Sequence, residues 1–425
     1  MTQSASKLLI IGAGQAAFAA ISELQRLNFD GTVLLVGNEA HLPYERPPLS
    51  KEVLLKSDAS LDDVSLQKPS FYSELNIEPL LGTSVTALDT EKKTATLSDG
   101  QVIAFDKCLI ATGCSPRTLP GLDCAAANIH YFRSWDDALK LKKALNADTR
   151  LGIIGGGFLG LELASTARTL GCQVALFERS DRLLPRHAPT FLSDWLIKQA
   201  QHQGIALHCG VEQLDVVPEG GEYRITAGDT SIQVNELAVM IGSVAGDQLA
   251  RQANIAVHPQ LGGIVVDGYG RTQHDDIFAA GDCTTQIDAD NQAFRLESWQ
   301  NANEQGRRAA SLMAGVEPSD AAFPWFWTDV FGSNIQMLGA YQPDLQYFSR
   351  GELSVGDDAP QSLSIGVKDN VIHHAIALNA ARDLRPLRKL LEEQTPVNTD
   401  QFIDPDVSMR EFSKSALSAT QQAAN

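Results

Sequence analysis

Two glycine-rich segments contain the residue types that bind the phosphates of a dinucleotide. They are GAGQAA at 12–17 and GGGFLG at 155–160. In such a turn one glycine permits the tight bend, a second lets the backbone approach a pyrophosphate, and a small third residue lets the next helix pack against its strand. The N–H groups at the start of that helix then bind the phosphate charge. Both segments therefore predict dinucleotide binding.

An acidic residue follows each turn at the distance expected for a ribose contact. Glu39 comes shortly after the second apolar strand of the first unit, and Glu178 ends the second strand of the other unit. A carboxylate at this point accepts hydrogen bonds from ribose hydroxyls. One glycine turn alone would be weak evidence, but two copies with an acid after each are strong evidence. The chain binds two dinucleotides, or one dinucleotide beside a relic of a second site.

The elements that position these turns occur twice along the chain. Residues 7–36 and 150–177 each contain an apolar strand, a glycine turn, an amphipathic helix and a second apolar strand. This is the βαβ unit. Further apolar strands are expected at 107–110, 237–241 and 277–282, a helix at 297–312, and strand-like segments from Phe323 to Leu378. The pattern predicts an α/β fold with two interleaved Rossmann-like dinucleotide-binding domains and a C-terminal α+β domain.

Composition excludes several functional classes. The 425 residues are too many for one ordinary core. The chain has 34 basic and 52 acidic residues, a net charge of −18, which disfavours binding to nucleic acid or to an anionic membrane. No apolar run is long enough for a transmembrane helix. The segment LLIIGAGQAAFAA after Lys7 looks like a signal peptide, but only a strand followed by a phosphate-binding turn explains its glycine spacing and the acidic residue downstream. We expect a soluble, cytoplasmic protein.

The cysteines are too scattered for a metal or redox centre. They are Cys108, Cys114, Cys124, Cys172, Cys209 and Cys283. No two of them form a C-x-x-C pair, so we expect no zinc site, no redox dithiol and no iron–sulfur cluster in this chain. Free thiols fit a reducing compartment.

Further motifs together resemble one family. They are LPYERPPLSK at 42–51, ATG at 111–113, IFAAGDC at 277–283, RLESWQNA at 295–302 and PWFWTD at 324–329. With the glycine turns they resemble the FAD-containing, NADH-dependent ferredoxin reductases that serve aromatic-ring dioxygenases and some cytochromes P450. The resemblance runs from about residue 7 to about residue 410 and is strongest to phenylpropionate-type systems. Putidaredoxin and rubredoxin reductases and the apoptosis-inducing-factor group are relatives of similar, glutathione-reductase-like build.

The resemblance implies FAD on the first unit and NADH on the second. It implies a first FAD-binding part at 1–115, an NADH-binding domain at 116–244, a second FAD-binding part at 245–322, the C-terminal α+β domain at 323–412, and a flexible tail at 413–425.

The resemblance also implies the site residues. Those expected to contact FAD are Gly12, Gly14, Ala16, Ala17, Asn38, Glu39, Arg46, Lys51, Val85, Ala111, Thr112, Gly113, Arg133, Gly281, Asp282 and Trp299. Those expected to contact NADH are Gly155, Gly157, Leu159, Gly160, Glu178 and Gly242. The family commonly has an aspartate where this chain has Asn38, and a Pro-Asn turn within 242–248.

Lys51 and Glu162 are the expected catalytic pair. In the family a lysine at this position pairs with a glutamate beside the flavin, where an ammonium favours the negatively charged reduced cofactor. The alternative is that Lys51 is a solvated charge after a proline turn. Glu178 would repel the 2′-phosphate of NADPH, which predicts NADH as the donor. Arg179 and Arg182 could weaken that preference, but we expect both to be solvated.

The resemblance implies a reaction and a partner. NADH gives a hydride to FAD, and single electrons then pass to a separate [2Fe–2S] ferredoxin and indirectly to a terminal oxygenase. Alternatives are a reductase of rubredoxin or another carrier, or an NADH-sensing scaffold like the apoptosis-inducing-factor group. Disulfide reductases of this build need a cysteine soon after the first unit, and none precedes Cys108.

Two basic groups are candidates for ferredoxin docking, and an aromatic group for the electron exit. The first basic group is Arg295, Arg307 and Arg308, and the second is Arg382, Arg385, Arg388 and Lys389. The aromatic group at 325–327 lines the flavin edge or packs in the core.

Overall fold

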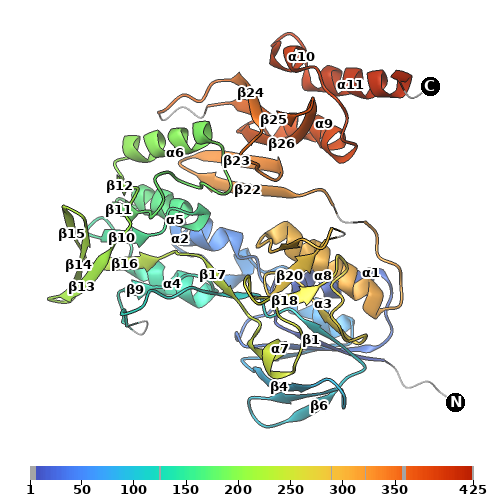
Figure 1. Ribbon diagram of the computed structural model, residues 1–425. Coiled ribbons are helices and arrows are strands. Elements are labelled where there is room, and N and C mark those ends of the chain that lie inside the picture. The colour runs from blue at the N-terminus through green and yellow to red at the C-terminus, as the bar shows by residue number, and fades with distance from the viewer. Residues whose placement is uncertain (1–5, 124–125, 289, 321, 357–359, 424–425) are drawn as a thin grey trace. The chain divides into compact units, whose positions relative to one another are not determined.

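The computed structural model describes residues 6–123, 126–288, 290–320, 322–356 and 360–423 (Figure 1). The chain divides into two compact units. Unit 1 comprises Met1–Pro48, Asp58–Pro116 and Ser243–Ala322, and unit 2 comprises Leu49–Ser57, Arg117–Gly242 and Phe323–Asn425. The chain therefore passes repeatedly between two units. The short segment 49–57 belongs to unit 2, although sequence analysis assigned it to the first FAD-binding part.

Unit 1 is built on a five-stranded parallel sheet in the order β19-β7-β1-β2-β3. Its strands are β1 (Lys7–Ile11), β2 (Thr32–Gly37), β3 (Ile77–Leu81), β7 (Lys107–Ile110) and β19 (Ile277–Ala279). Side chains of β1 alternate between two cores. Leu8 and Ile10 face one cluster, and Leu9 and Ile11 face the other. A strand that is covered on both faces has no polar side, which explains its unbroken apolar run.

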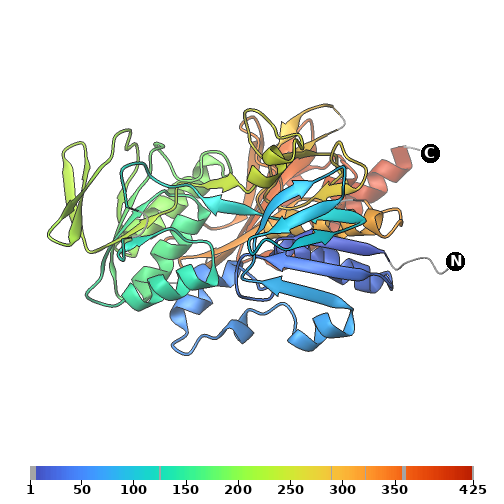
Figure 2. The same ribbon diagram turned by 90° about the horizontal axis from the view of Figure 1, so that it is seen from below.

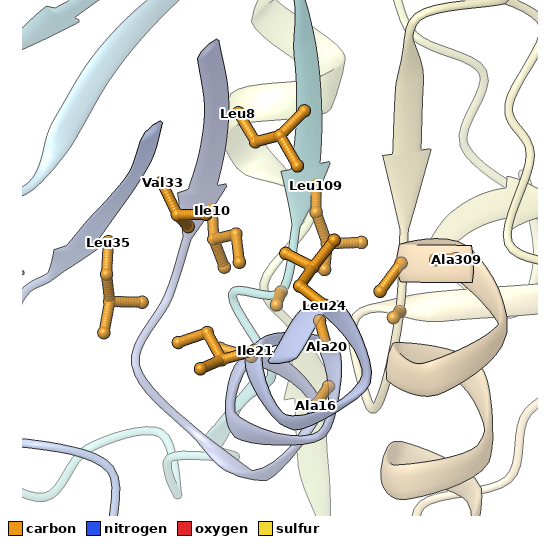
Figure 3. Packing of buried hydrophobic residues seen from close by; sticks show 14 of the residues in the cluster. Leu8, Ile10, Ala16, Ala20, Ile21, Leu24, Val33, Leu35, Leu109 and Ala309 are labelled. Carbon is orange, nitrogen blue, oxygen red and sulfur yellow. The ribbon is translucent and has the colours of Figure 1, made fainter. Parts of the chain in front are cut away.

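Two helices, α1 (Gln15–Arg26) and α8 (Trp299–Met313), contribute to the first of these cores. Figure 3 shows Ala16, Ala20 and Ile21 of α1 and Ala309 of α8 beside the sheet residues. The two helices approach closely because their contact residues are small. A Cβ at Gly306 would lie 2.2 Å from the carbonyl oxygen of Ala16.

The remaining elements of unit 1 are short. They are α3 (Pro69–Glu74), β4 (Val85–Asp89), β5 (Thr94–Leu97), β6 (Val102–Ala104), β8 (Cys114–Pro116), β17 (Ser243–Ala245), α7 (Gln248–Gln252), β18 (Ile264–Val266), β20 (Thr284–Ile287), β21 (Ala293–Phe294) and the 3₁₀ turn η2 (Leu61–Asp63). Strands β4, β5 and β6 form an antiparallel sheet over the second core. Two further elements, η1 (Pro47–Ser50) and α2 (Glu52–Leu55), lead into and form part of segment 49–57.

Unit 2 repeats the parallel design with the order β12-β11-β10-β16-β9. Its elements are β9 (Ile129–His130), α4 (Trp135–Ala144), β10 (Arg150–Ile154), α5 (Phe158–Thr169), β11 (Gln173–Phe177), α6 (Thr190–His202), β12 (Ala206–His208), β13 (Asp215–Glu219), β14 (Glu222–Ala227), β15 (Thr230–Val234) and β16 (Glu236–Val239). The antiparallel strands β13–β15, yellow-green in Figure 2, pack on this sheet through Tyr223, Ile225 and Val234. The duplicated βαβ unit is confirmed, because β10 pairs with β11 as β1 pairs with β2.

The C-terminal part of unit 2 contains an antiparallel sheet in the order β22-β23-β26-β25-β24. Its elements are β22 (Trp325–Val330), β23 (Ser333–Gly339), β24 (Gln346–Gly351), β25 (Ser362–Lys368), β26 (Val371–Leu378), α9 (Ala381–Glu392), α10 (Thr399–Ile403) and α11 (Met409–Ala423). The predicted fold class, two Rossmann-like regions and a C-terminal α+β domain, is confirmed.

The predicted flexible tail is wrong for residues 413–423, which belong to α11. Met409, Phe412 and Ala416 are buried in one cluster with residues of α9 and β26. They recur at the helical spacing of three and four residues, so they form one apolar stripe. Charged and polar residues between them hide this stripe in the composition. Residues 424 and 425 lie outside the described part of the chain.

His374 predicts an acid sensitivity of this C-terminal domain. Its side chain on β26 is 1% exposed, and Nδ1 lies 2.7 Å from the hydroxyl of Tyr347, with the ring of Tyr341 nearby. Burial lowers the pKa of His374 from 6.5 to about 4. The unfolded chain therefore takes up the proton first as the pH falls. The resulting stability is complete above about pH 6.5 and is lost towards pH 4.

We expect the free energy of unfolding of the wild type to fall by about 3 kcal/mol more than that of His374→Gln across this window. Urea unfolding at several pH values, followed by tryptophan fluorescence, measures the difference. Parallel pH profiles for the two proteins would contradict the expectation.

Candidate functional site

The two glycine turns have the same backbone geometry. Gly12 and Gly155 have φ values of +109° and +110°, which side chains rarely allow. A Cβ on Gly12 would lie 2.1 Å from the carbonyl oxygen of Ala111, and one on Gly155 would lie 2.3 Å from that of Met240. Each turn is thus pressed against the end of the neighbouring parallel strand. Only glycine fits there.

The helix that follows each turn begins at open space. Gly14 and Gly157 are the N-cap residues of α1 and α5, and neither helix has a side-chain cap or an acidic residue in its first turn. A Cβ at either glycine would have no atom within 4 Å. The first N–H groups of a helix have no partner within it and are positively polarised. Both turns therefore fit the pyrophosphate of a dinucleotide.

Packing explains the last small residue of each motif. A Cβ on Gly160 would lie 2.0 Å from the carbonyl oxygen of Gly155, so the second unit requires glycine at this position. The first unit has Ala17 there, which is fully buried, with Ala16 also buried beside it. Leu159 lies in the first turn of α5.

Glu39, after β2, is joined to the loop that contains Arg46. The guanidinium of Arg46 lies 2.6 Å from Oε1 of Glu39, and the hydroxyl of Tyr44 donates to Oε2. Burial by itself raises the pKa of Glu39, but the charge of Arg46 and the hydrogen bonds from Tyr44 and Arg46 lower it below its usual range. The structure thus places two predicted FAD residues in direct contact. Asn38 directly precedes Glu39 in the chain.

Glu178 contacts the second glycine turn directly. Its Oε2 accepts the backbone N–H of Gly156 at 2.7 Å, and its Oε1 accepts that of Ser180 at 2.8 Å. The carboxylate is therefore fixed at the edge of the turn, after β11, as a ribose-binding acid requires.

The expectation that Arg182 is solvated is wrong. Its guanidinium donates to the carbonyl oxygens of Ala188 and Pro185 and to the hydroxyl of Ser193, at 2.7–3.0 Å. These bonds fasten the loop between β11 and α6. Arg182 is committed to this loop, whereas Arg179 is exposed. Glu178 thus has one fewer neighbouring cation that could turn towards a 2′-phosphate.

Several other predicted FAD residues gather where the parallel strands of unit 1 end. The Thr112 hydroxyl, after β7, donates to the carbonyl oxygen of Gly246 at 2.6 Å. The N–H of Gly281, after β19, donates to Gln305 of α8 at 2.7 Å. Asp282 accepts from the thiol of Cys114 at 3.4 Å. Carboxyl ends of parallel strands are where doubly wound sheets bind ligands.

The N-terminus of α8 lies in the same region of unit 1. Trp299 is its first residue, and the hydroxyl of Ser298 caps the helix by accepting the N–H of Asn301 at 3.1 Å. Gly113 and Gly281 have positive φ, as turns after strands require. Val85 begins β4, in the second core of this unit.

Two of the residues predicted to contact FAD, Lys51 and Arg133, belong to unit 2, as does Gly242, which was predicted to contact NADH. Lys51 is in segment 49–57, Arg133 precedes α4 and donates its N–H to Asp137, and Gly242 follows β16 with its carbonyl oxygen bonded to Arg117. Gly242 has a φ of +96°.

Lys51 and Glu162 form a buried ion pair. Nζ of Lys51 lies 3.0 Å from Oε1 of Glu162, and their side chains are 10% and 11% exposed. The interpretation of Lys51 as a solvated charge is therefore wrong. Sequence reasoning missed three polar partners of this pair, Ser50, Thr328 and Asp329, although all lie within the motifs 42–51 and 324–329.

Most of the proposed docking cations already have partners. Arg295 pairs with Glu297, Arg307 with Glu304, Arg388 with Glu392 and Lys389 with Glu393, and Arg308 stacks over Tyr269. Arg382 and Arg385 are exposed on the first half of α9. The docking face stays a prediction.

The aromatic group at 325–327 divides between the two faces of β22. Trp325 and Trp327 stack with ring centroids 4.8 Å apart, while Phe326 packs on Phe158 of α5 at 4.5 Å.

Within the described residues, no group of three or more His, Cys, Asp or Glu side chains could hold a metal ion. No helix in the same part of the chain is long and apolar enough to cross a membrane.

Comparison with known proteins gives the family. A model of the pyridine nucleotide-disulphide oxidoreductase family matches residues 6–306, and a reductase C-terminal model matches residues 325–413. The chain belongs to the pyridine nucleotide-disulphide oxidoreductase family. This confirms an oxidoreductase. FAD and NAD(H) are the cofactors of this family, as predicted.

Within this family, the chain is similar to ferredoxin reductases. The 3-phenylpropionate/cinnamic acid dioxygenase ferredoxin–NAD(+) reductase component of Photorhabdus laumondii is 35% identical, covering 92% of this chain and 97% of its own. The benzene 1,2-dioxygenase ferredoxin–NAD(+) reductase subunit of Pseudomonas putida is 33% identical, over 96% and 98%. The crystal structure of the covalent putidaredoxin reductase–putidaredoxin complex matches with a TM-score of 0.89 at 28% identity, over 97% and 99% of the two chains. The predicted resemblance to ferredoxin reductases is confirmed, while the roles of individual residues stay predictions.

The position of Glu178 predicts nucleotide preference. We expect Glu178→Gln, which removes the charge but keeps an oxygen acceptor for Gly156, to raise the NADPH-to-NADH ratio of kcat/KM about ten- to hundredfold. Steady-state kinetics with a small electron acceptor measures this ratio. Asp181→Asn is the matched control, because it removes an exposed negative charge three residues away. Equal ratios in the wild type and Glu178→Gln would contradict the assignment.

Proposed function

We propose that this protein is an FAD-containing NADH:ferredoxin reductase that supplies electrons to an aromatic-ring dioxygenase. The observation that carries the proposal is the pair of matched glycine turns, each with open space at a helix N-terminus. The named activities of the relatives point to the same function. The reducing setting expected for its free thiols favours the cytoplasm.

In this proposal the first βαβ unit, which lies in unit 1, holds FAD. The N–H groups at the start of α1 bind the pyrophosphate, Glu39 and Asn38 contact the adenosine ribose, and Asp282 binds the ribityl chain. The chemistry that bound FAD supplies is the conversion of one two-electron hydride donation into two single-electron transfers. The first turn of α8 adds a positive partial charge, which favours a negatively charged reduced cofactor.

The second βαβ unit, which lies in unit 2, orients the nucleotide donor NADH. The start of α5 binds the pyrophosphate of NADH, and Glu178 accepts hydrogen bonds from its ribose. No acid or base is needed for a hydride transfer, so the chain contributes alignment and electrostatics. Lys51 contributes a fixed ammonium, and Glu162 holds that ammonium in place.

Electrons must leave to a separate carrier. The five described cysteines are free thiols, and Cys108 and Cys283 are fully buried. Desolvation raises the pKa of Cys209 to about 11, so this thiol is protonated near neutral pH. None of these features suits disulfide chemistry or cluster ligation within the described residues.

A coupled assay tests the proposal. The purified holoprotein is mixed with NADH, cytochrome c and one of several [2Fe–2S] ferredoxins. We expect cytochrome c reduction that depends on ferredoxin, and a loss of about tenfold or more in Lys51→Met, because a positive charge beside the cofactor is removed. Lys68→Met, at an exposed position, is the control.

Slow reduction with every ferredoxin, together with a long-lived complex with NADH, would contradict the proposal and favour a scaffold function. If the protein reduced a rubredoxin faster than every ferredoxin, the electron acceptor would be assigned as a rubredoxin instead.

A further inference from the structure

One face of α5 matches one face of β22. Phe158 and Glu162 are four residues apart on the helix, a rise of about 6 Å. Phe326 and Thr328 are two residues apart on the strand, a rise of nearly 7 Å. The similar spacing lets Phe326 pack against Phe158, with the two rings tilted, while the Thr328 hydroxyl reaches Glu162. The C-terminal domain therefore contributes a polar group to the Glu162 carboxylate.

Three donors converge on this carboxylate. Oε1 of Glu162 accepts from the Thr328 hydroxyl at 2.7 Å and from Nζ of Lys51 at 3.0 Å, and Oε2 accepts from the Ser50 hydroxyl at 2.6 Å. Ser50 and Thr328 are both 2% exposed. Both oxygens of the Glu162 carboxylate are therefore hydrogen-bonded.

Segment 49–57, which contains Lys51, is itself fastened within unit 2. The Thr166 hydroxyl of α5 donates to the carbonyl oxygen of Ser50 at 2.7 Å, and Nζ of Lys142 donates to that of Val53 at 2.9 Å. The backbone beside Lys51 is therefore fixed by bonds other than the ion pair.

Lys51 also has a second acidic neighbour. Oδ2 of Asp329 lies 3.5 Å from Nζ, and the Asp329 side chain is 46% exposed. Asn334, opposite Asp329 on β23, donates to its Oδ1 at 2.7 Å. The ammonium thus lies between a buried and a half-exposed carboxylate. The hydroxyls of Ser50 and Thr328 fix the buried Glu162 carboxylate, and so favour the pairing of Lys51 with Glu162 over its pairing with Asp329.

We propose that Thr328 and Ser50 are positioning residues for the Lys51–Glu162 pair. They fix the Glu162 carboxylate, which in turn fixes the Lys51 ammonium where the proposed reaction needs it. This inference rests on the proposed function. β-branched residues favour strands in any case, but a strand alone needs no hydroxyl here. A buried hydroxyl has a partner in nearly all proteins, and the partner of this one is the carboxylate that pairs with Lys51.

Variants at Thr328 test the inference by removing or keeping the hydroxyl group. Thr328→Val removes the hydroxyl at nearly constant volume, and Thr328→Ser restores it. Thr149→Val is the matched control, because Thr149 is also 2% exposed and its hydroxyl donates to the carbonyl oxygen of Ala144 at 2.7 Å, away from Glu162. Thermal unfolding of all three variants checks that they fold alike.

The first measurement is the acetylation rate of Lys51, by N-hydroxysuccinimide acetate and peptide mass spectrometry, relative to the exposed Lys68. Losing one hydrogen bond at the carboxylate should raise this rate about threefold or more in Thr328→Val. Thr328→Ser and Thr149→Val should stay near the wild type. A wild-type rate in Thr328→Val would overturn the inference.

The second measurement uses the FAD-loaded protein. In Thr328→Val we expect a more negative flavin midpoint potential and a kcat about threefold lower, with an unchanged KM for NADH, and restoration of both in Thr328→Ser. Faster labelling with an unchanged potential and kcat would also overturn the inference. Failure of the proposed function shows separately, as a wild type that reduces no ferredoxin, while the labelling ratio still decides whether Thr328 holds the pair.

Discussion

The close backbone approach at the two glycine turns is the constraint on which the rest of the structure depends. Gly12 is pressed against Ala111 and Gly155 against Met240, so no side chain fits at either turn. This contact aligns the end of the first strand with that of its neighbour and starts the next helix at open space. A helix N-terminus with unpaired N–H groups is a site for anions. The proposed binding of both pyrophosphates follows from that geometry, which is present once in each unit.

Sequence alone could predict what local patterns determine. The glycine turns, the acids Glu39 and Glu178, and the apolar strands all depend on short spacings, and the structure contains each of them. Contacts between distant segments could not be derived. Thr328 lies in a strand of alternating faces, but no spacing shows that its hydroxyl reaches Glu162. The stripe of α11 was missed because charged and polar residues separate its three apolar members.

The C-terminal domain also takes part in the candidate site. Its strand β22 contributes Phe326, Thr328 and Asp329 to the surroundings of α5 and Lys51. Glu162 falls within the oxidoreductase family match and Thr328 within the reductase C-terminal match. A buried ion pair is costly unless its remaining hydrogen-bonding groups are satisfied. The hydroxyls of Ser50 and Thr328 meet that need, so the pair depends on segments far apart in the chain.

The visible absorption spectrum of the purified protein, recorded before and after anaerobic addition of NADH, tests the central claim most directly. The account predicts a yellow protein that absorbs blue light through about one FAD per chain, and rapid loss of that absorbance when NADH is added. A preparation supplied with FAD that stays colourless after removal of excess cofactor, or a yellow protein whose absorbance NADH leaves unchanged, would contradict it.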